Sequence, residues 1–491
     1  MKILIENGNV CSLDLPLKFA QKLYAEFAIR HPNAFYLRTR QRGMQNWDGK
    51  IHYINKHGEF KIGLLPAVYE KCIEYGIKPK VVDMRQPLPE VNEVVTKIGE
   101  YKLRPEQEKA VKAVINNKVG KVPFQIGVLD YTVNAGKTLI MSSLYLSYKK
   151  QLKTLLITND SDWLNQARDE FKKYLPGEQI TFVQGKVLNW SNFTIGMVQS
   201  ISRNMRFYQN ELAKVDMVLV DEADQAGSKQ YQNVLTRLFN TRVRIGLSGT
   251  IYMSKLAKDK VKNMNLEVFF GKVLAEFKLK DSIKKGYSTR TIVKMVPSKP
   301  WYGNWESEEV SYKEVYDDSI TFNKYAKKMV YSRLKWNLKQ GRYPALVVCK
   351  FIAHCENLCK YFKKKLGSKY NIACVHVDTP SKIRQQIMKD FREGKIDILV
   401  STTIIARGKN FPKLRYLLNA ASMDSQEKSI QFLGRLVRTD SSKKKVYLDD
   451  LHYPGPYLNR HGKHRKQYYQ KQELKVILLE KIWKNHPIHS L

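Results

Sequence analysis

Phe124-Gln-Ile-Gly-Val-Leu-Asp-Tyr-Thr-Val-Asn-Ala-Gly-Lys-Thr138 is the stretch of sequence that decides the fold. Its apolar run, Ile126–Leu129, is typical of a strand buried on both faces of a parallel sheet. Gly136-Lys137-Thr138 closes the stretch, and the next residues, Leu139–Tyr148, have the composition of a helix. A strand, a tight loop and a helix in this order make one unit of an α/β domain.

The loop before this helix predicts a phosphate-binding site. Lys137 is placed to reach the β- and γ-phosphates of a nucleotide, and the Thr138 hydroxyl to ligate Mg²⁺. Backbone N–H groups and the start of the helix cradle the anion. Asn134 and Tyr131 stand where such loops have small residues, but asparagine tolerates a left-handed backbone better than other non-glycine residues. The predicted cofactors are ATP and Mg²⁺, and the loop residues that bind them are Asn134, Ala135, Gly136, Lys137 and Thr138.

Two long regions repeat the alternation of apolar runs and helical stretches. The first contains Phe124–Leu129, Thr154–Ile157, Phe193–Val198, Met217–Val220 and Arg244–Leu247; the second contains Ala345–Val348, Ala373–His376, Ile396–Val400, Tyr416–Asn419 and Lys445–Leu448. We therefore predict an α/β protein with two tandem, doubly wound parallel-sheet domains, over residues 96–290 and 291–455. No direct sequence repeat relates the two series.

The ends of the chain differ from this pattern. Residues 1–95 predict a small α+β module, with a strand in Met1–Val10, a helix over Leu15–Ala28 and a hairpin turn at Trp47-Asp-Gly-Lys50. Gln86–Glu90 reads as a linker. Basic and aromatic residues alternate in the module, and a phosphate-tracking surface is expected from Arg38, Arg40, Arg42, Trp47 and Lys50. Trp47 could instead pack into the module's own core. Residues 456–491 predict a basic tail with a helix over Glu473–Trp483.

The overall charge points to a polyanionic partner. Lys and Arg number 85 against 46 Asp and Glu, which gives a formal net charge of +39. Nucleic acid is the expected partner, and a membrane surface is the rival. No apolar stretch approaches the roughly 18–20 residues that span a bilayer, and the N-terminus shows no signal-peptide pattern, so a cytoplasmic location is expected. The six cysteines predict buried thiols rather than a metal site.

Two further motifs supply the remaining chemistry of nucleotide hydrolysis. Asp221-Glu222 ends an apolar run, which places its carboxylates at the carboxyl edge of the sheet beside the phosphates. Asp221 would hold Mg²⁺ and Glu222 would polarise the attacking water. Arg435 and Arg438 are three residues apart, which would put them on one face of a helix, where they could meet γ-phosphate oxygens as arginine fingers.

Taken together and in this order, the motifs resemble those of superfamily 2 nucleic-acid helicases, over roughly residues 96–455. The resemblance implies two RecA-like domains, with Arg104 and Gln107 near the adenine and Gln431 joining the two arginines in catalysis. It assigns Asn159, Gln166, Gln199, Ser200, Thr402 and Thr403 to the nucleic-acid strand, Gly408 and Asn410 to the ribose side of the cofactor, and Ser248, Gly249 and Thr250 to coupling. Asn410 departs from the usual aspartate.

Finer details of the motifs separate possible substrates. Asp-Glu-Ala-Asp at 221–224 is shared with DEAD-box RNA helicases, but Ser-Gly-Thr at 248–250 and Gln431 resemble DNA-acting relatives. Asn46–Lys50 resembles the N-terminal domain of the phage UvsW-type recombination helicases. The expected function is an ATP-dependent DNA helicase or translocase in recombination or repair, with single-stranded and branched DNA as partners and RNA possible in R-loops. An RNA helicase and an ATP-switched annealing clamp are the alternatives.

Overall fold

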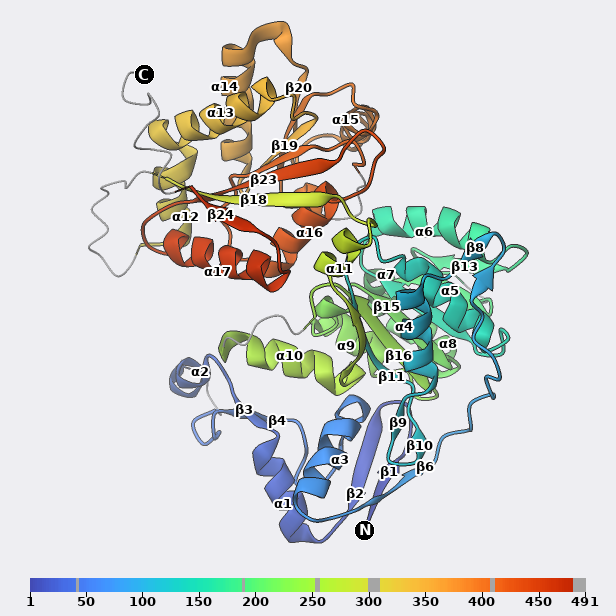
Figure 1. Ribbon diagram of the computed structural model, residues 1–491. Coiled ribbons are helices and arrows are strands. Elements are labelled where there is room, and N and C mark those ends of the chain that lie inside the picture. The colour runs from blue at the N-terminus through green and yellow to red at the C-terminus, as the bar shows by residue number, and fades with distance from the viewer. Residues whose placement is uncertain (41–43, 188–189, 252–256, 299–309, 407–410, 480–491) are drawn as a thin grey trace. The chain divides into compact units, whose positions relative to one another are not determined.

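The computed structural model describes residues 1–40, 44–187, 190–251, 257–298, 310–406 and 411–479. The chain divides into two compact units, Met1–Phe277 and Lys278–Leu491 (Figure 1). Within the described residues, no helix has the length and apolarity needed to cross a membrane.

The first unit begins with a small module built on a mixed four-stranded sheet, in the order β5-β2-β1-β6. β1 pairs antiparallel with β2 and parallel with β6. The elements of the module are β1 (Lys2–Ile5), β2 (Val10–Asp14), α1 (Leu17–Glu26), β3 (Ala28–Arg30), α2 (Ala34–Arg40), β4 (Lys50–His52), β5 (Phe60–Lys61), α3 (Leu65–Glu74) and β6 (Lys80–Asp83).

The hairpin turn expected at Trp47–Lys50 is wrong. β4 does begin at Lys50, but it pairs with β3, and Ile29 lies opposite Ile51. The connection between the two strands is therefore long and carries α2. Gly49, at φ +77°, takes the left-handed conformation that the Asp-Gly pattern signals, so the chain bends at this glycine although it does not form a tight hairpin there.

The module is not separate from the domain that follows it, because a single hydrophobic cluster contains residues of both. Arg244, which is fully buried at the start of a strand of that domain, donates hydrogen bonds to the Gly8 carbonyl at 2.7 Å and to Asn9 Oδ1 at 2.8 Å. Burial, together with the nearby Arg85, lowers the pKa of Arg244 to about 9. The module is thus tied to its neighbour through a buried cation as well as through apolar packing.

The rest of the first unit is a seven-stranded parallel sheet in the order β13-β14-β12-β15-β16-β11-β17. Its strands are β11 (Ile126–Tyr131), β12 (Thr154–Thr158), β13 (Ile180–Val183), β14 (Phe193–Met197), β15 (Met217–Asp221), β16 (Val243–Ser248) and β17 (Val273–Phe277). Its helices are α4 (Pro105–Ile115), α5 (Lys137–Ser147), α6 (Ser161–Tyr174), α7 (Val198–Arg203), α8 (Met205–Ala213), α9 (Lys229–Leu235) and α10 (Ala257–Phe270). Two small ribbons pair β7 (Lys97–Ile98) with β8 (Tyr101–Lys102) and β9 (Lys118–Val119) with β10 (Val122–Pro123).

The second unit holds another seven-stranded parallel sheet, in the order β20-β21-β19-β22-β23-β18-β24. Its strands are β18 (Arg290–Pro297), β19 (Ala345–Cys349), β20 (Ile372–Val375), β21 (Ile398–Thr402), β22 (Tyr416–Asn419), β23 (Lys445–His452) and β24 (Val476–Leu478). Its helices are α11 (Leu279–Lys284), α12 (Tyr312–Tyr316), α13 (Lys324–Lys339), α14 (Ile352–Leu366), α15 (Ser381–Glu393), α16 (Gln426–Leu436) and α17 (Leu458–Lys471). The two tandem RecA-like sheets confirm the predicted fold class.

The C-terminal segment differs from its prediction. The helix expected over Glu473–Trp483 is wrong in its described part, because Val476–Leu478 is a strand that extends the sheet beside β18. The helix lies earlier, in α17, where the fully buried Arg465 is ion-paired with Asp450 at 2.9 Å. The described part of this segment is therefore integral to the second unit and is not a tail. Five of the six cysteines are buried, as expected.

Candidate nucleotide and nucleic-acid site

Three neighbouring strands of the first sheet end at one edge and bring three of the predicted motifs together. β16 lies between β15 and β11, with Asp221 opposite Leu247 and Asp130 opposite Ser248. Because all three strands are parallel, their carboxyl ends meet at the same edge of the sheet. The phosphate loop, the acidic motif and Ser248–Thr250 follow directly from these ends, at the position where open α/β sheets bind their ligands.

The phosphate loop has the backbone that its sequence requires. Asn134 has φ +64° and Gly136 φ +71°, so the asparagine adopts the left-handed conformation predicted for it. Gly136 immediately precedes α5, and Lys137 is the first residue of that helix. This left-handed conformation favours glycine at position 136, and a Cβ atom there would lie 2.3 Å from Nε2 of Gln107, whose side chain would have to move. Tyr131 is buried, and its hydroxyl donates to the Glu106 carbonyl at 2.6 Å, which ties β11 to α4.

Arg104 and Gln107 contact the phosphate loop from the start of α4. Gln107 Nε2 donates to the Ala135 carbonyl at 2.8 Å, and Arg104 Nη1 donates to the Asn134 carbonyl at 3.3 Å. Gln107 Oε1 accepts from the Arg104 backbone N–H at 2.8 Å. Both residues therefore brace the loop in this conformation, and their contact with adenine stays a prediction.

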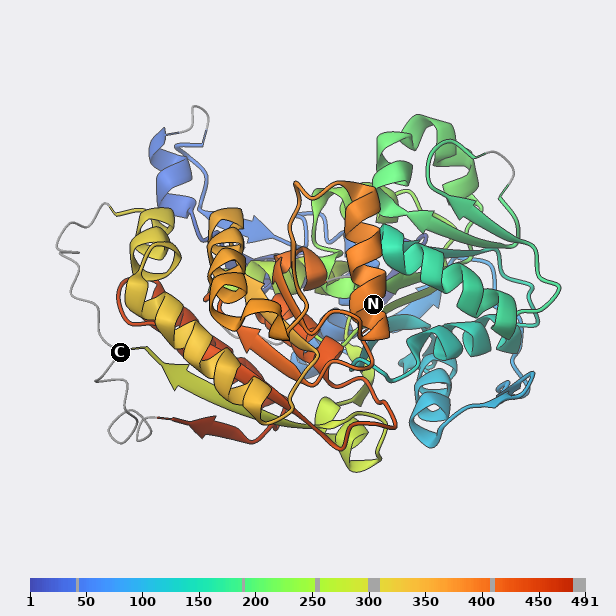
Figure 2. The ribbon, with the colours of Figure 1, turned by 90° about the horizontal axis from the view of Figure 1, so that it is seen from above.

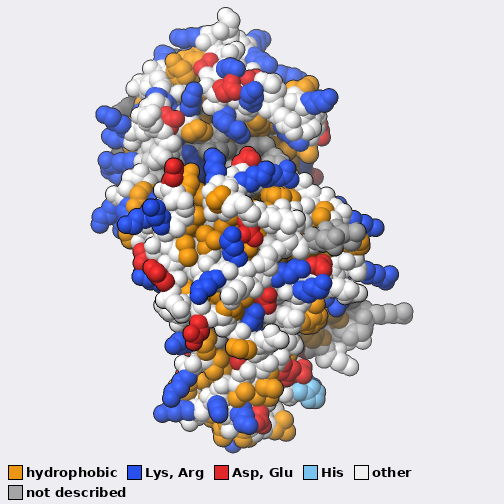
Figure 3. Space-filling model, turned by 90° about the vertical axis from the view of Figure 1, so that its right-hand side faces the viewer, with side chains coloured by type: hydrophobic (Ala, Val, Ile, Leu, Met, Phe, Trp, Pro, Cys, Tyr) orange, Lys and Arg blue, Asp and Glu red, His pale blue; other side chains and the backbone are white. Residues whose placement is uncertain are grey.

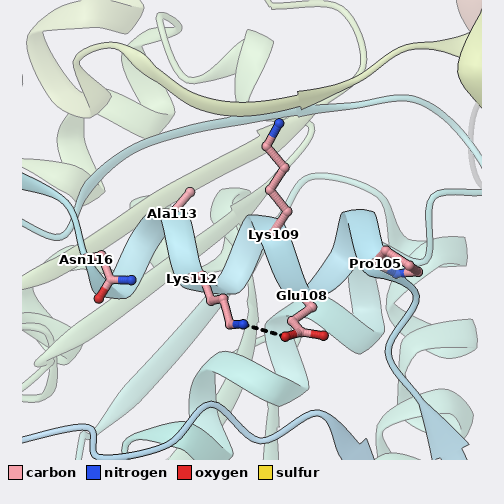
Figure 4. Close-up of a pocket in the computed structure, with 6 residues that line it drawn as sticks. All are labelled: Pro105, Glu108, Lys109, Lys112, Ala113 and Asn116. Atoms are coloured by element: carbon pink, nitrogen blue, oxygen red, sulfur yellow. Dashed lines mark ion pairs between the residues drawn. The ribbon is translucent and has the colours of Figure 1, made fainter.

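The outer face of α4 carries a different feature, a shallow pocket of about 520 Å³ (Figure 4). It is lined by Pro105, Glu108, Lys109, Lys112, Ala113 and Asn116. Lys112 and Glu108 form an ion pair of 2.6 Å on this face. Since Arg104, Gln107 and the phosphate-loop residues are absent from this lining, the pocket is not part of the predicted nucleotide site.

Asp221 and Lys137 form the charged centre of the site. Lys137 Nζ lies 3.8 Å from Asp221 Oδ1, which is buried and accepts no hydrogen bond from the described residues. Burial raises the pKa of Asp221, and Lys137 offsets only part of this effect. A buried carboxylate oxygen without a hydrogen-bond donor is a candidate ligand for a hard cation, and such oxygens are the ligands that Mg²⁺ prefers.

Glu222 and Asp224 both follow the end of β15, but their environments differ. Glu222 has φ +53° and ψ +47°, a conformation that a non-glycine residue adopts at a cost of roughly 1–3 kcal/mol and that is concentrated at functional sites. Asp224 is buried and accepts from Ser248 Oγ at 2.7 Å. Ser248 Oγ also lies 3.0 Å from Thr250 Oγ1, so the acidic motif is hydrogen-bonded to the predicted coupling motif.

Gly249 is held against β11. A Cβ atom at this position would lie 2.9 Å from Thr132 Cα and 3.1 Å from the Tyr131 carbonyl oxygen. Only glycine lets the chain after β16 pass so close to the strand that leads into the phosphate loop. The coupling motif thus contacts the nucleotide side of the site directly.

Three of the predicted strand-binding residues lie at or near the neighbouring ends of β12 and β14. Gln199 Nε2 donates to the Asn159 carbonyl at 3.2 Å, and Asn159 Nδ2 donates to Gln225 Oε1. Ser200 follows Gln199 in α7. Gln166 lies apart on α6, where it is exposed and donates to Glu170 at 2.7 Å.

Gln225 is a residue that the sequence reasoning missed. It ends the short helix Ala223–Gln225 that follows the acidic pair and reaches back to Asn159. Its place directly after the acidic tetrapeptide was the available signal. Through Gln225 the acidic motif reaches the residues expected to hold the nucleic-acid strand.

The second unit places its predicted residues on two elements. Thr402 ends β21, and Thr403, in the turn that follows, accepts from Lys428 Nζ of α16 at 3.3 Å. Gln431 and Arg435 lie on α16. Gly408 and Asn410 lie outside the described residues.

The expectation that Arg435 and Arg438 share one helix face is wrong. α16 ends at Leu436, two residues before Arg438. The backbone N–H of Thr289 donates to the Val437 carbonyl at 2.8 Å, and the Thr289 hydroxyl donates to the Arg438 carbonyl at 3.1 Å. These contacts replace the next helical turn, so Arg438 lies beyond the end of the helix. The role of both arginines as fingers stays a prediction.

In the N-terminal module, Arg38 and Lys50 line one pocket of about 560 Å³ together with Arg30 and Phe35. Arg40 lies instead over the Tyr36 ring, 4.8 Å from its centroid. Trp47 is half-buried; its Nε1 donates to the Lys50 carbonyl at 2.8 Å, and its ring meets His31 edge-on. Trp47 therefore braces the turn that carries Lys50. Arg42 lies outside the described residues.

Comparisons with known proteins agree with this geometry. Residues 100–253 match the model of the type III restriction enzyme res subunit, and residues 326–440 match the helicase conserved C-terminal domain. The Saccharomyces cerevisiae protein named "Putative ATP-dependent helicase IRC3" is 24% identical over 377 residues, which cover 71% of this chain and 51% of that protein. The chain therefore spans about half the length of this relative.

Two solved structures extend the comparison. Yeast Dbp5 bound to RNA and ADP BeF3 is 14% identical, covers 78% of this chain and 91% of its own, and has a TM-score of 0.52. T4 UvsW is 18% identical and covers 97% of this chain and 99% of its own, with a TM-score of 0.44. The two family models together match just over half of the chain, on the same two sheets that carry the motifs. The chain belongs to the superfamily 2 helicases, which are ATP-dependent and built on two RecA-like domains.

Proposed function

We propose that this protein is an ATP-dependent DNA helicase or translocase that unwinds or branch-migrates forks, junctions and R-loops. The observation that carries the proposal is the hydrogen-bonded connection from the acidic motif through Gln225 to Asn159 and Gln199. It links the residues that would sense the γ-phosphate to the residues that would grip a strand. A hydrogen-bond network of this kind couples two sites when it has two discrete arrangements that both sites bias.

The nucleotide site fits Mg²⁺·ATP on its own chemistry. Asp221 offers a buried carboxylate oxygen without a hydrogen-bond donor, and Thr138 stands beside Lys137 at the start of α5. These two residues would hold the metal, which neutralises phosphate charge when bound. Lys137 would meet the phosphates, and Glu222 would orient the attacking water.

DNA is favoured over RNA by the motif sequences and by the basic, aromatic N-terminal module. Arg30, Arg38 and Lys50 meet around one pocket beside the exposed ring of Phe35. This arrangement suits phosphate contacts combined with stacking on unpaired bases at a branch. Phosphate contacts carry little sequence information, so the substrate is expected to be selected by its structure.

The proposal is tested by ATPase stimulation compared across single-stranded DNA, forked DNA, Holliday junctions, R-loops and single-stranded RNA, followed by strand displacement on the best substrates. Branched DNA is expected to give the strongest stimulation and ATP-dependent displacement. Stimulation by RNA alone would identify an RNA helicase. Annealing without displacement would identify a clamp, and either result would overturn the proposal.

A further inference from the structure

The most basic continuous part of the described chain lies outside every motif, on helices α13 and α14 of the second unit. Residues 324–369 contain eleven lysines, two arginines and a single acidic residue, Glu356. Basic side chains are spread over the face of the molecule shown in Figure 3, so a surplus alone is not distinctive. The arrangement of the lysines on these two helices is distinctive.

On α13 the lysines form a row. Lys324, Lys328, Lys335 and Lys339 are all exposed and follow a spacing of four, seven and four residues, which keeps them on one side of the helix. The opposite side of α13, including Val330 and Leu334, is buried against the sheet. Among the described residues, no carboxylate pairs with Lys324, Lys335 or Lys339.

α14 lies beside α13 and doubles the row (Figures 1 and 2). The rings of Tyr331 and Tyr361 meet edge-on at 5.5 Å between the two helices. Lys327 lies 5.3 Å over the Tyr361 ring and Lys335 lies 5.6 Å over the Tyr331 ring. The exposed lysines on α14 are Lys360, Lys363, Lys364 and Lys365. We call these four, together with Lys324, Lys327, Lys328, Lys335 and Lys339, the lysine face.

Several of these lysines lie at positions that do not stabilise their own helices. Lys324 and Lys327 lie in the first turn of α13, where the helix dipole disfavours cations. Like charges four residues apart, as in Lys335–Lys339 and Lys360–Lys364, cost a few tenths of a kcal/mol each. The dipole favours the cations in the two last turns, Lys339 of α13 and Lys363, Lys364 and Lys365 of α14, and it does not account for the other five. These destabilising positions would be explained if the lysines serve to bind a polyanion.

We infer that the lysine face binds the sugar–phosphate backbone of a duplex arm, as a second nucleic-acid surface in addition to the strand-binding motifs. α13 has 16 residues and is therefore roughly 24 Å long, which matches about seven base pairs of duplex. A straight row on a rigid helix suits a stiff, regular polyanion better than a flexible strand. α13 and α14 cover the face of the second sheet opposite to α16 and α17 (Figure 1), so the lysine face is on a different side of this unit from Gln431 and Arg435.

The test is a variant with Lys324, Lys328, Lys335 and Lys360 all replaced by Gln. Its matched control carries four other exposed lysines replaced by Gln: Lys118, Lys121, Lys444 and Lys463. Both variants lose the same charge, and thermal melting checks that both are folded. Affinity is measured against salt for a fork with a 20-base-pair arm and for a 12-nucleotide single strand, and each full-length protein is also assayed for ATPase.

If four phosphate contacts are lost, the slope of log K against log salt on the fork should become shallower by roughly 3.6 in the first variant. The control should change it by less than about 1. ATPase stimulation by the short strand should stay at the wild-type level in both, because the motifs are intact. Equal slopes for the two variants on the fork, or a wild-type slope in the first, would overturn the inference. The inference rests on the proposed function, and failure of that function would show separately as a wild-type ATPase that no nucleic acid stimulates.

Discussion

The two RecA-like sheets share one topology but use their buried carboxylates in opposite ways. Numbered along the chain within each sheet, both have the strand order third, fourth, second, fifth, sixth, first, seventh. In the first sheet Asp221 has a loose ion-pair partner, Lys137, at 3.8 Å, and an Oδ1 that accepts no hydrogen bond from the described residues. In the second sheet Asp450 is saturated by Asn419, Arg465 and Tyr469.

This difference distinguishes a carboxylate that stabilises the fold from one that belongs to the functional site. Asp450 anchors α17 to β23 and closes that part of the fold. Arg465 also donates to the carbonyls of Met423 and Leu451, so both partners of the buried pair are fully hydrogen-bonded. Although burial alone would lower it, Asp450 holds the pKa of Arg465 above its ordinary value. Asp221, in contrast, keeps a buried oxygen that accepts no hydrogen bond from the described residues, and a bound cation would satisfy it.

The largest effect is expected where the first sheet departs from the second. Lys137→Ala should reduce ATP hydrolysis below detection and weaken nucleotide binding, because it removes the cation that meets the phosphates. Glu222→Gln should preserve binding and cut turnover by about 10²–10⁴-fold, the range for loss of a general base. Fluorescent-nucleotide binding and steady-state ATPase separate the two. A Glu222→Gln protein with wild-type turnover would remove Glu222 from the reaction.

The arginines of the second unit should contribute to hydrolysis less than Lys137 does. Arg435→Ala and Arg438→Ala are each expected to lower turnover on the order of 10³-fold or more, with nucleotide binding retained. Lys444→Gln, an exposed position in the same unit, is the control. Because Arg438 follows the helix and Arg435 lies within it, the two losses need not be equal. Normal nucleic-acid-stimulated ATPase in either mutant would exclude that arginine.

The two carboxylates should respond in opposite ways to the same substitution. Asp450→Asn leaves the buried Arg465 without its counter-charge and should cost about 3–5 kcal/mol of unfolding free energy, measured by urea denaturation. Asp221→Asn should abolish hydrolysis while the unfolding free energy at pH 7 stays at or above that of the wild type.

The pH dependence of stability follows from the raised pKa of Asp221. A carboxyl whose pKa is higher in the folded state binds its proton more tightly there, so its contribution to stability falls as pH rises above the ordinary value for aspartate. The advantage of Asp221→Asn should therefore be present at neutral pH and disappear as the pH approaches about 4. A lower stability of Asp221→Asn at pH 7 would show that Asp221, like Asp450, serves the fold.

The sequence predicted the strands of both sheets where buried runs are bounded by polar residues. Tyr416–Asn419 matches β22 residue for residue, and Thr154–Ile157 falls one residue short of β12. β13 was missed because it is short and only half-buried, and Thr181 interrupts its apolar residues. β24 is apolar, but its residues Val476–Leu478 fall inside the stretch predicted as a helix. β17 and β18 were missed as well, and in both strands buried and more exposed residues alternate.

At the site, the sequence predicted the residue types but not the contacts between them. The left-handed Asn134 followed from local chemistry. The contact of Gln107 with the phosphate loop and the reach of Gln225 to Asn159 depend on how separate strands end together. The chain directly after α16 is hydrogen-bonded to Thr289, which is more than 140 residues away in the sequence, and no local pattern could report this contact.

The coupling motif offers a smaller, more local test. Gly249→Ala brings a methyl group within 2.9 Å of Thr132 Cα, which must shift the loop after β16 or the end of β11. We expect the added methyl group to lower the free energy of unfolding by about 1–3 kcal/mol through overpacking. We also expect the shifted loop to weaken the coupling between ATP hydrolysis and strand displacement. Gly227→Ala is the control, since its nearest neighbour would be at an ordinary 3.5 Å. If both variants behave alike, the close approach at Gly249 does not matter for coupling.

The smallest effect is expected from the N-terminal module, which sharpens the comparison because it belongs to the first unit. Deleting residues 1–95 is a poor test, because it would open the shared hydrophobic core and strip Arg244 of the Gly8 and Asn9 oxygens. Arg38→Gln with Lys50→Gln is better, since both residues are exposed and line the same pocket. If both meet phosphates, the salt slope on a junction should become shallower by roughly 1.8. Basal ATPase should be unchanged, because the nucleotide motifs lie after residue 100.

The matched control is Lys18→Gln with Lys78→Gln, because both lysines are exposed on the same module but lie outside the pocket. A wild-type slope for Arg38→Gln with Lys50→Gln would mean that the module serves the first sheet as a structural cap and leaves the DNA to the motor domains.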